Sequence, residues 1–292
     1  MLDSGFYDRL SRLQLAMAHK SSLNMSGNRK SVHKGISAEF SDFREYMPGD
    51  DLRRLDWNVY ARLDRMYIRE YMEEKEAVVS VLLDTSASMD YGKEKKSVLA
   101  EELVAVVSFL ALNNMDRVAI FDMKEMSRGI VLGGGRNAFT RVIAWLNERT
   151  YEGECDMLAA LKKMPMRGPG VTILISDFLH PAMLEDADGG YEKVLKYLSY
   201  RRQRPVILQT LAKEELRIDM EGTRNLIDME TNSKLRITMD AAAIDSYEQE
   251  LNRMLSRMKK GCKGCQGAYV LCDASCDRNQ LIFEDLRVLY DI

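Results

Sequence analysis

The amino-acid sequence predicts an α/β protein with a doubly wound, mostly parallel sheet that carries helices on both faces. From residue 77 onward, short apolar runs of strand length alternate with segments of helical length, a pattern typical of parallel strands joined by crossover helices. Two of the runs, residues 77–83 and 171–176, are rich in Val, Ile and Leu and stop at an aspartate. Buried parallel strands form such continuous apolar runs, and polar groups gather at their carboxyl ends.

The composition bounds the class of protein. The 292 residues are 46% hydrophobic and 30% charged, which is ordinary for a soluble globular protein and sufficient for one large or two modest domains. The formal net charge of −3 argues against a general nucleic-acid binder, because such proteins carry a basic surplus or stripe.

No apolar run approaches the roughly 20 residues that cross a bilayer, and the first residues lack a signal-peptide core. With five cysteines, an odd number that fits a reduced compartment, these features predict a cytoplasmic protein without membrane insertion.

The N-terminal part, residues 1–76, is predicted to be separate from the sheet domain. Apolar side chains at helical spacing predict an amphipathic helix over residues 2–19, and the Ser, Asn and Gly residues of 21–28 predict a loop. Residues 35–62 mix arginines, carboxylates and aromatics without a helix or strand period, so we expect Arg–carboxylate pairs across folded-back turns. Residues 66–72 alternate apolar and charged side chains, which predicts a partly exposed strand.

Two interpretations of residues 35–62 stay open. The segment is either a structural support for the next domain, in which the charged groups pair with one another, or a functional surface. A functional surface would be an acidic cluster at Asp50 and Asp51 or a docking face. The candidate partner-binding residues are Arg44, Asp50, Arg53, Asp56 and Trp57.

The sheet domain is predicted to span residues 77–292. Its strands are predicted at residues 77–83, 117–123, 129–132, 171–176, 205–211 and 268–271, with 129–132 as an antiparallel edge. Its helices are predicted at residues 95–114, 137–148, 157–164, 241–260 and 278–290. Residues 217–238 alternate and contain turn residues, which predicts an inserted β-hairpin. The glycines at 133–135 lack the Lys-Ser/Thr ending of a phosphate-binding loop, so we expect no ATP binding by that route.

The candidate site lies where two predicted strands end. Asp84, Ser86 and Ser88 follow the first strand, and Asp177 follows the second. One tight loop can turn a carboxylate and two hydroxyls toward a common point, and a neighbouring strand would bring Asp177 to the same edge. Oxygen-only ligands suit a hard divalent cation, Mg²⁺ or Mn²⁺. Alternatively, the serine hydroxyls only satisfy backbone groups of the loop.

Two stretches resemble known families. The Asp-x-Ser-x-Ser at residues 84–88 resembles the first loop of the metal-ion-dependent adhesion site of von Willebrand factor A domains. Residues 35–62 resemble the signature of the bacterial "domain of unknown function 58" family, whose members carry it just before a von Willebrand A-like domain. The resemblance extends from residue 35 to the C-terminus and implies that fold for the sheet domain. The matching signature residues are Phe40, Arg44, Tyr46, Pro48, Gly49, Asp50, Arg53, Asp56, Trp57, Ala61 and Arg62.

The resemblance also implies a ligand set. In von Willebrand A domains the first loop is completed by a threonine from a second loop and an aspartate from a third, and a carboxylate of the bound partner fills the last position. Asp177 matches the third loop, whereas Cys155 stands where the second-loop threonine is expected. A thiol is a soft, poor ligand for Mg²⁺, so the site either binds metal weakly, uses Asp156 or Thr150 instead, or has lost the metal while keeping its loops.

A site of this kind recognises a partner, so we expect a non-enzymatic adaptor or chaperone-like protein. The family resemblance implies the kind of partner, because its members are typically associated with MoxR-type AAA+ ATPases in the maturation of other proteins. Two alternatives stay open: a metal-dependent hydrolase or phosphotransferase that uses Asp84, Asp177 and, as a further candidate, Asp50, and a structural module with a vestigial loop. The sequence offers no evident catalytic base, and His180, three residues after Asp177, is more simply a surface residue.

The remaining cysteines resemble a zinc spacing only superficially. Cys262 and Cys265 are followed by Cys272 and Cys276, and six residues between the pairs is short for a zinc site. We expect free thiols, with a structural zinc or a redox pair as the alternatives.

Overall fold

The computed structural model describes residues 38–73, 78–133, 136–166, 168–184, 190–219, 222–227, 229 and 234–289. The chain divides into two compact units, one spanning residues 26–76 and one that contains residues 77–292. The predicted helix at 2–19 and the predicted loop at 21–28 lie outside the described residues.

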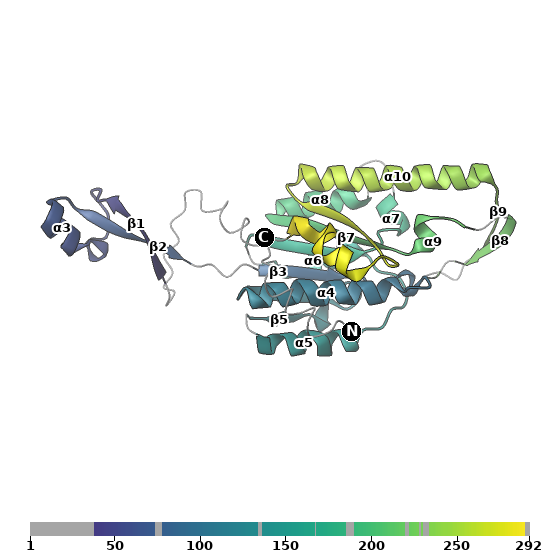
Figure 1. Ribbon diagram of the computed structural model, residues 1–292, viewed down its shortest axis with the longest axis horizontal. Coiled ribbons are helices and arrows are strands. Elements are labelled where there is room, and N and C mark those ends of the chain that lie inside the picture. The colour runs from purple at the N-terminus through teal and green to yellow at the C-terminus, as the bar shows by residue number, and fades with distance from the viewer. Residues whose placement is uncertain are drawn as a thin grey trace. The chain divides into compact units, whose positions relative to one another are not determined.

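The smaller unit contains a two-stranded antiparallel sheet and one short helix (Figure 1). The sequence does not predict β1 or α3. None of the α3 residues is buried, so the helix leaves no apolar period to detect. Leu55 and Ile68 are buried and lie opposite one another in a β-bridge, which ties η1 to β2. The elements are β1 (Ala38–Glu45), η1 (Leu52–Arg54), α3 (Trp57–Leu63) and β2 (Tyr67–Glu73).

A six-stranded sheet organises the larger unit (Figure 1). Its strand order is β10-β7-β6-β3-β4-β5, and each neighbouring pair is parallel except β4 with β5. The doubly wound, mostly parallel sheet predicted from the sequence is therefore confirmed, and so is its antiparallel edge. The strands are β3 (Val78–Leu83), β4 (Arg117–Asp122), β5 (Ile130–Leu132), β6 (Gly170–Ser176), β7 (Gln203–Leu211) and β10 (Ala268–Asp273).

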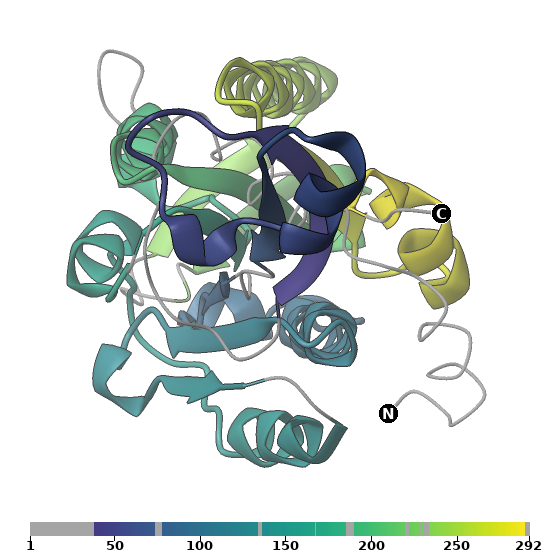
Figure 2. The ribbon, with the colours of Figure 1, turned by 90° about the vertical axis from the view of Figure 1, so that its left-hand side faces the viewer.

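Helices cover both faces of this sheet. α4 and α5 lie on one face, and α6, α8 and α10 lie on the other (Figure 2). Among the described residues, none of the helices is apolar over the length that a bilayer crossing requires. The helices are η2 (Ala87–Asp90), α4 (Lys96–Asn113), η3 (Met126–Arg128), α5 (Arg136–Asn147), α6 (Met157–Lys163), α7 (Pro181–Leu184), α8 (Gly190–Tyr200), α9 (Lys213–Leu216), α10 (Ala241–Gly264), α11 (Arg278–Phe283) and η4 (Asp285–Leu289).

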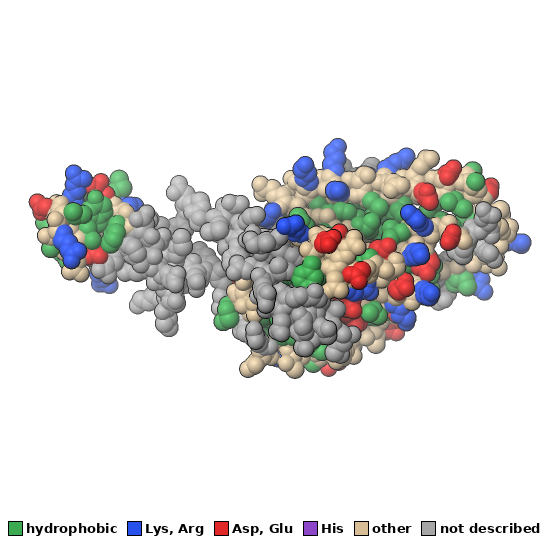
Figure 3. Space-filling model, viewed as in Figure 1, with side chains coloured by type: hydrophobic (Ala, Val, Ile, Leu, Met, Phe, Trp, Pro, Cys, Tyr) green, Lys and Arg blue, Asp and Glu red, His purple; other side chains and the backbone are tan. Residues whose placement is uncertain are grey.

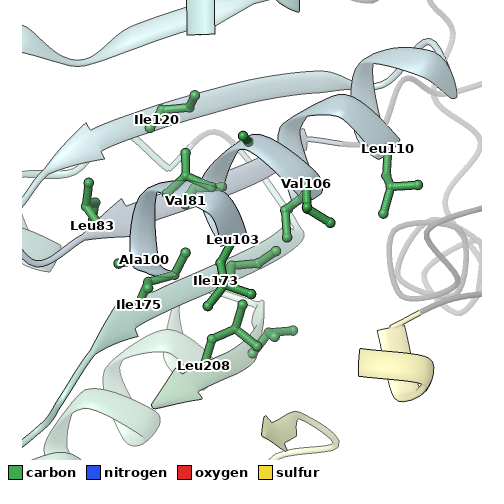
Figure 4. Close-up of a cluster of buried hydrophobic side chains, with 14 of the residues drawn as sticks. Val81, Leu83, Ala100, Leu103, Val106, Leu110, Ile120, Ile173, Ile175 and Leu208 are labelled. Atoms are coloured by element: carbon green, nitrogen blue, oxygen red, sulfur yellow. The ribbon is translucent and has the colours of Figure 1, made fainter. Parts of the chain in front are cut away.

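The larger core forms between α4 and the strands beneath it (Figure 4). Leu103 and Val106 of α4 point toward Val81 of β3, Ile173 of β6 and Leu208 of β7, and all five are almost fully buried. Removing this much apolar surface from water is the main force that holds the helix on the sheet. The position of α4 matters for function, because its first turn lies at the carboxyl edge of the strands.

Several helical segments depart from the sequence prediction. α8 was not predicted, although its buried residues Tyr191, Val194, Leu195 and Leu198 follow helical spacing. The single helix predicted at residues 278–290 is instead α11 followed by η4, because the chain turns to bury further leucines in the core. The short helix α9 was also not predicted. It precedes the inserted hairpin, which is present as predicted and consists of β8 (Gly222–Ile227) and β9 (Lys234–Met239).

The surface of the larger unit is mixed in charge. Lys and Arg side chains are interspersed with Asp and Glu side chains over the face that Figure 3 shows. This mixture agrees with the nearly balanced formal charge of −3 for the whole chain.

Candidate functional site

Three neighbouring parallel strands each end in an aspartate. Asp84 follows β3, Asp122 is the last residue of β4, and Asp177 follows β6. Because β3 lies between β4 and β6, the three side chains share the carboxyl edge of the sheet, where ligands bind in open α/β folds. All three are buried, with 6%, 5% and 2% of their surface exposed. A buried carboxylate needs a counter-ion or hydrogen bonds, so the partners of each aspartate determine what this edge can do.

Asp122 has its own counter-ion. Its Oδ2 accepts a hydrogen bond from Arg149 Nη1 at 3.0 Å, and its Oδ1 accepts one from the Thr85 hydroxyl at 2.6 Å. The Arg149 guanidinium also lies 4.3 Å from the centre of the Trp145 ring, which adds a cation–π contact. Asp122 is therefore a neutralised, structural carboxylate.

Asp177 also has an internal counter-ion. Its Oδ2 accepts a hydrogen bond from Lys96 Nζ at 2.7 Å, and its Oδ1 accepts one from the Leu179 N–H at 3.0 Å. Lys96 belongs to the first turn of α4 and is fully buried. Its ammonium donates a second hydrogen bond to Glu215 Oε1 at 2.6 Å, so one positive charge is shared between two carboxylates.

Asp84 differs from both neighbours. Its Oδ1 accepts the Ser86 N–H at 2.9 Å and its Oδ2 accepts the Ser176 hydroxyl at 2.5 Å. Within the described part of the chain, Asp84 forms no ion pair with a lysine or arginine. Burial raises the pKa of the Asp84 carboxyl, and the nearby charge of Asp177 raises it further, while the hydrogen bonds from Ser176 and Ser86 oppose the shift. Asp84 is thus the aspartate of this edge whose charge is not compensated by any basic side chain that the structure describes.

The serine hydroxyls predicted as ligands lie beside this carboxylate. Ser86 and Ser88 have their Oγ atoms 3.1 Å apart, and Ser86 hydrogen-bonds Asp84 through its side chain as well. The sequence pattern produces this arrangement because η2 begins directly after Ser86 and folds Ser88 back over the strand end. The structure therefore brings Asp84, Ser86, Ser88 and Asp177 to one edge of the sheet, as predicted from their spacing.

The second loop packs directly against the first. The Glu152 N–H donates to the Thr85 carbonyl at 3.1 Å, and the Ala87 N–H donates to the Gly153 carbonyl at 2.9 Å. The Cys155 side chain is buried next to Asp84 and Thr85, and burial, reinforced by the Asp84 charge, raises the pKa of the thiol to about 12. The thiol therefore stays protonated at neutral pH, where it is a poor metal ligand.

The two substitutes considered for the second-loop threonine, Asp156 and Thr150, have other contacts in the structure. The Asp156 Oδ1 accepts the Ala159 N–H at 2.9 Å and so caps the N-terminus of α6. Thr150 is exposed and lines a polar cavity of about 240 Å³ together with Asp122 and Arg149.

Comparison with known proteins identifies the family. The model of the family described as "Protein of unknown function DUF58" matches residues 42–256. The chain belongs to the DUF58 family. Uncharacterized proteins of Mycobacterium tuberculosis and Mycobacterium bovis are each 25% identical over 264 residues, which cover 88% of this chain and 81% of theirs. The family expected from the signature residues is therefore confirmed.

Solved structures similar to this DUF58 protein have low sequence identity. BatB, a conserved hypothetical protein from Bacteroides thetaiotaomicron, is 14% identical with a TM-score of 0.40, over 73% of this chain and 98% of that chain. An aerotolerance-related membrane protein from Bacteroides fragilis is 15% identical with a TM-score of 0.40, over 73% and 99%. A von Willebrand factor type A protein from Catenulispora acidiphila is 12% identical with a TM-score of 0.36, over 62% and 43%.

The residues of this DUF58 protein fit a hard divalent cation at Asp84. The carboxylate has no counter-ion among the residues that the structure describes, and the hydroxyls of Ser86 and Ser88 complete an oxygen-only donor set of the kind that Mg²⁺ and Mn²⁺ prefer. Asp177 reaches the same edge, but its Oδ2 is already paired with Lys96. The described residues contain no group of three His, Cys, Asp or Glu side chains arranged for a metal, so an ion here would also depend on hydroxyls and water.

Sequence reasoning missed four residues of this edge. Asp122 carries the same signal as Asp84, an aspartate at the end of an apolar strand, and was detectable. Ser176 precedes Asp177 and was detectable only from the position of β6. Lys96 and Glu215 left no signal, because nothing in the sequence connects residues that are 119 positions apart.

The predicted partner-binding residues of the DUF58 signature have mostly structural contacts. Arg44 Nη2 pairs with Asp50 Oδ2 at 2.7 Å, as expected for Arg–carboxylate pairing in this segment. The Asp56 side chain caps α3 by accepting two backbone N–H groups. Arg53 is exposed, and Trp57 has 63% of its surface exposed, so both side chains are available to another molecule.

The structure describes all five cysteines of the chain, and none of them forms a disulfide. Cys262 and Cys272 are buried, and Cys265 and Cys276 are half-buried. The described residues contain no group of three or more His, Cys, Asp or Glu side chains placed to hold a metal, and the choice between free thiols, a structural zinc and a redox pair stays a prediction.

Asp84→Asn is expected to raise the free energy of unfolding by about 0.5–2 kcal/mol in metal-free buffer at neutral pH, as often happens when a residue is kept for function at a cost in stability. The amide removes a buried charge that lacks a counter-ion in the described part of the chain, and it keeps a hydrogen-bonding partner for Ser86 and Ser176. Urea titration of both proteins in EDTA measures the difference, with Asp90→Asn as the control, because Asp90 is 41% exposed in the same loop.

The difference in unfolding free energy between wild type and Asp84→Asn should depend on pH with a defined sign. Because the pKa of Asp84 is raised in the folded state, the folded protein holds this proton at pH values where the unfolded chain has released it. Its contribution to stability is present below the unfolded pKa of about 4 and is lost as the pH rises through the folded pKa. The stability advantage of Asp84→Asn should therefore grow as the pH rises above about 4, and an advantage that shrinks instead would contradict the assignment.

Proposed function

We propose that this protein is a non-enzymatic adaptor that binds a protein partner at the carboxyl edge of its sheet. One observation carries the proposal. Of the three buried aspartates at this edge, Asp122 and Asp177 have their own counter-ions, whereas Asp84 has none among the described residues and lies beside two serine hydroxyls. An uncompensated buried carboxylate with hydroxyls next to it is suited to an external cation.

A divalent cation such as Mg²⁺ or Mn²⁺, held by Asp84, Ser86 and Ser88, would supply an open coordination position that accepts an acidic side chain of the partner. The chain's own residues do the rest. The hydrogen bond from Ser176 fixes the orientation of the Asp84 carboxylate, and the Glu152–Thr85 and Gly153–Ala87 contacts hold the first loop in place. Recognition by a rigid edge of this kind loses little conformational entropy on binding.

The same geometry disfavours a catalytic role. A general base or nucleophile has to be poised near neutral pH and oriented by a neighbour. Asp122 and Asp177 are each paired with a basic side chain, Arg149 and Lys96 respectively, and the raised pKa of Cys155 keeps its thiol protonated. We assign the remaining carboxylate, Asp84, to the cation and propose no reaction at this edge.

The identity of the partner is proposed on the family resemblance alone. A MoxR-type AAA+ ATPase, acting with the adaptor in the maturation of a client protein, fits the role that the resemblance implies. The exposed Trp57 and Arg53 of the signature segment offer a second surface, separate in sequence from the Asp84 loop, for one of these two proteins.

Affinity purification with a matched pair of variants tests the proposal. Tagged wild type, Asp84→Ala and Asp90→Ala are isolated from cells in buffer with Mg²⁺ or with EDTA, and the captured proteins are identified by mass spectrometry. We expect at least one abundant protein to be retained by wild type and Asp90→Ala with Mg²⁺ and lost with Asp84→Ala or EDTA. Identical sets of proteins in all samples would refute the role of the Asp84 loop, and an enriched set without an AAA+ ATPase would refute the proposed partner.

A further inference from the structure

Lys96 is a charged side chain buried inside the candidate site. It has no exposed surface, while its neighbour Lys95 has 51% of its side-chain surface exposed and pairs with Asp90. Burying an ammonium is expensive unless it is paired and hydrogen-bonded. Lys96 meets this condition with two short contacts, to Asp177 Oδ2 at 2.7 Å and to Glu215 Oε1 at 2.6 Å.

Both partners of Lys96 are held in place by the backbone. Glu215 Oε2 accepts the Ala212 N–H at 2.8 Å, and the Glu215 carbonyl accepts the Tyr247 hydroxyl at 2.8 Å. Asp177 Oδ1 accepts a backbone N–H at 3.0 Å. The ammonium is therefore fixed between Asp177 and Glu215 of α9.

We propose that Lys96 is a built-in cation that sets a low affinity of the Asp84 site for divalent ions, an inference that rests on the function proposed above. Asp84 and Asp177 are close enough to affect each other electrostatically, so both carboxylates would attract an ion at this edge. Lys96 cancels most of the charge of Asp177 and repels a second cation. The ion is then held mainly by Asp84, Ser86 and Ser88.

Weak binding of the ion has a thermodynamic consequence for partner recognition. Lys96 neutralises one of the two carboxylates near the ion, and a partner that supplies a carboxylate restores that negative charge. The partner then strengthens the binding of the ion, and the ion strengthens the binding of the partner by the same factor. The adaptor would hold the metal well only in its complex. Lys96 acts here as a positioning and charge-setting residue, because its ammonium is buried against Asp177 and Glu215.

Mn²⁺ binding to the purified protein tests this inference without any assay of activity. The free Mn²⁺ in a titration is measured by electron paramagnetic resonance. Lys96→Met is expected to bind Mn²⁺ at least about tenfold more tightly than wild type, because Asp177 regains its full charge near the ion. Lys95→Met removes the same charge one residue away, at an exposed site, and should change the affinity less than about twofold.

Glu215→Gln tests the inference in the opposite direction. Without the Glu215 carboxylate, the positive charge of Lys96 is no longer shared and compensates Asp177 alone. The affinity of the site for Mn²⁺ should therefore fall below that of wild type. Glu214→Gln removes the same charge from the same short helix without a contact to Lys96, and it should have a smaller effect.

The outcomes separate this inference from the proposed function. If folded Lys96→Met binds Mn²⁺ no more tightly than wild type, the inference is wrong. If Lys96→Met does not fold, Glu215→Gln decides, and an unchanged or increased affinity overturns the inference. The adaptor role fails independently, if Asp84→Ala captures the same proteins as wild type whatever the order of the Mn²⁺ affinities.

Discussion

Lys96→Met is expected to lower the free energy of unfolding by about 3–5 kcal/mol in metal-free buffer, the usual cost of removing one member of a buried ion pair. The substitution keeps a long, unbranched side chain, so it leaves the packing of α4 nearly intact. It removes the counter-ion of Asp177 and of Glu215, whose side chains are 3% and 15% exposed. Two buried carboxylates would then lack compensation. Urea unfolding followed by circular dichroism measures the change.

Lys95→Met is the control for this loss. Its side chain is 51% exposed and its partner Asp90 is 41% exposed, so the pair is screened by water and contributes at most about 1 kcal/mol. The expected contrast is therefore several kcal/mol between two adjacent lysines. A Lys96→Met protein as stable as Lys95→Met would show that the ammonium does not compensate the two carboxylates.

Arg149→Met is expected to cost about 3 kcal/mol by the same reasoning at the other side of the edge. The Arg149 and Asp122 side chains are 2% and 7% exposed, and their atoms lie 3.0 Å apart. The variant also loses the contact of the guanidinium with the Trp145 ring. Because Asp122 holds Thr85, which lies in the first loop, we expect hydrogen exchange to quicken in this loop as well.

Arg128→Met provides the comparison for Arg149. Arg128 pairs with Glu125 within one turn, and the two side chains are 62% and 45% exposed. A pair of this kind contributes only about 0.3–0.5 kcal/mol. Equal stability losses for Arg149→Met and Arg128→Met would contradict the assignment of Asp122 as a buried structural carboxylate.

The sheet and the first loop were predictable from the sequence because their signals are local. β3 and β6 are continuous apolar runs that stop at Asp84 and Asp177, and a parallel sheet brings such strand ends to one edge. The serines follow at fixed spacing and need no distant residue to be recognised. Asp122 carried the same local signal on β4 and was not used.

The ion pairs that distinguish the three aspartates were not predictable from the sequence. Lys95 and Lys96 are adjacent and chemically identical, and only the docking of α4 on the sheet decides which one is buried. Glu215 lies beyond β7 in a helix of four residues, too short to give a period. The second loop was located by resemblance to a family, and its contacts with Thr85 and Ala87 emerged only from the structure.

The contacts that give this edge its electrostatic character join parts of the chain that are far apart: 81 positions for Lys96 with Asp177, 92 for Asp84 with Ser176, and 119 for Lys96 with Glu215. Closing such long segments costs chain entropy before any contact is gained. During folding, the edge should therefore assemble after the strands have aligned. A synthetic peptide that contains the Asp-x-Ser-x-Ser pattern would have the residues of the first loop but not the distant contacts that set the charge of the site.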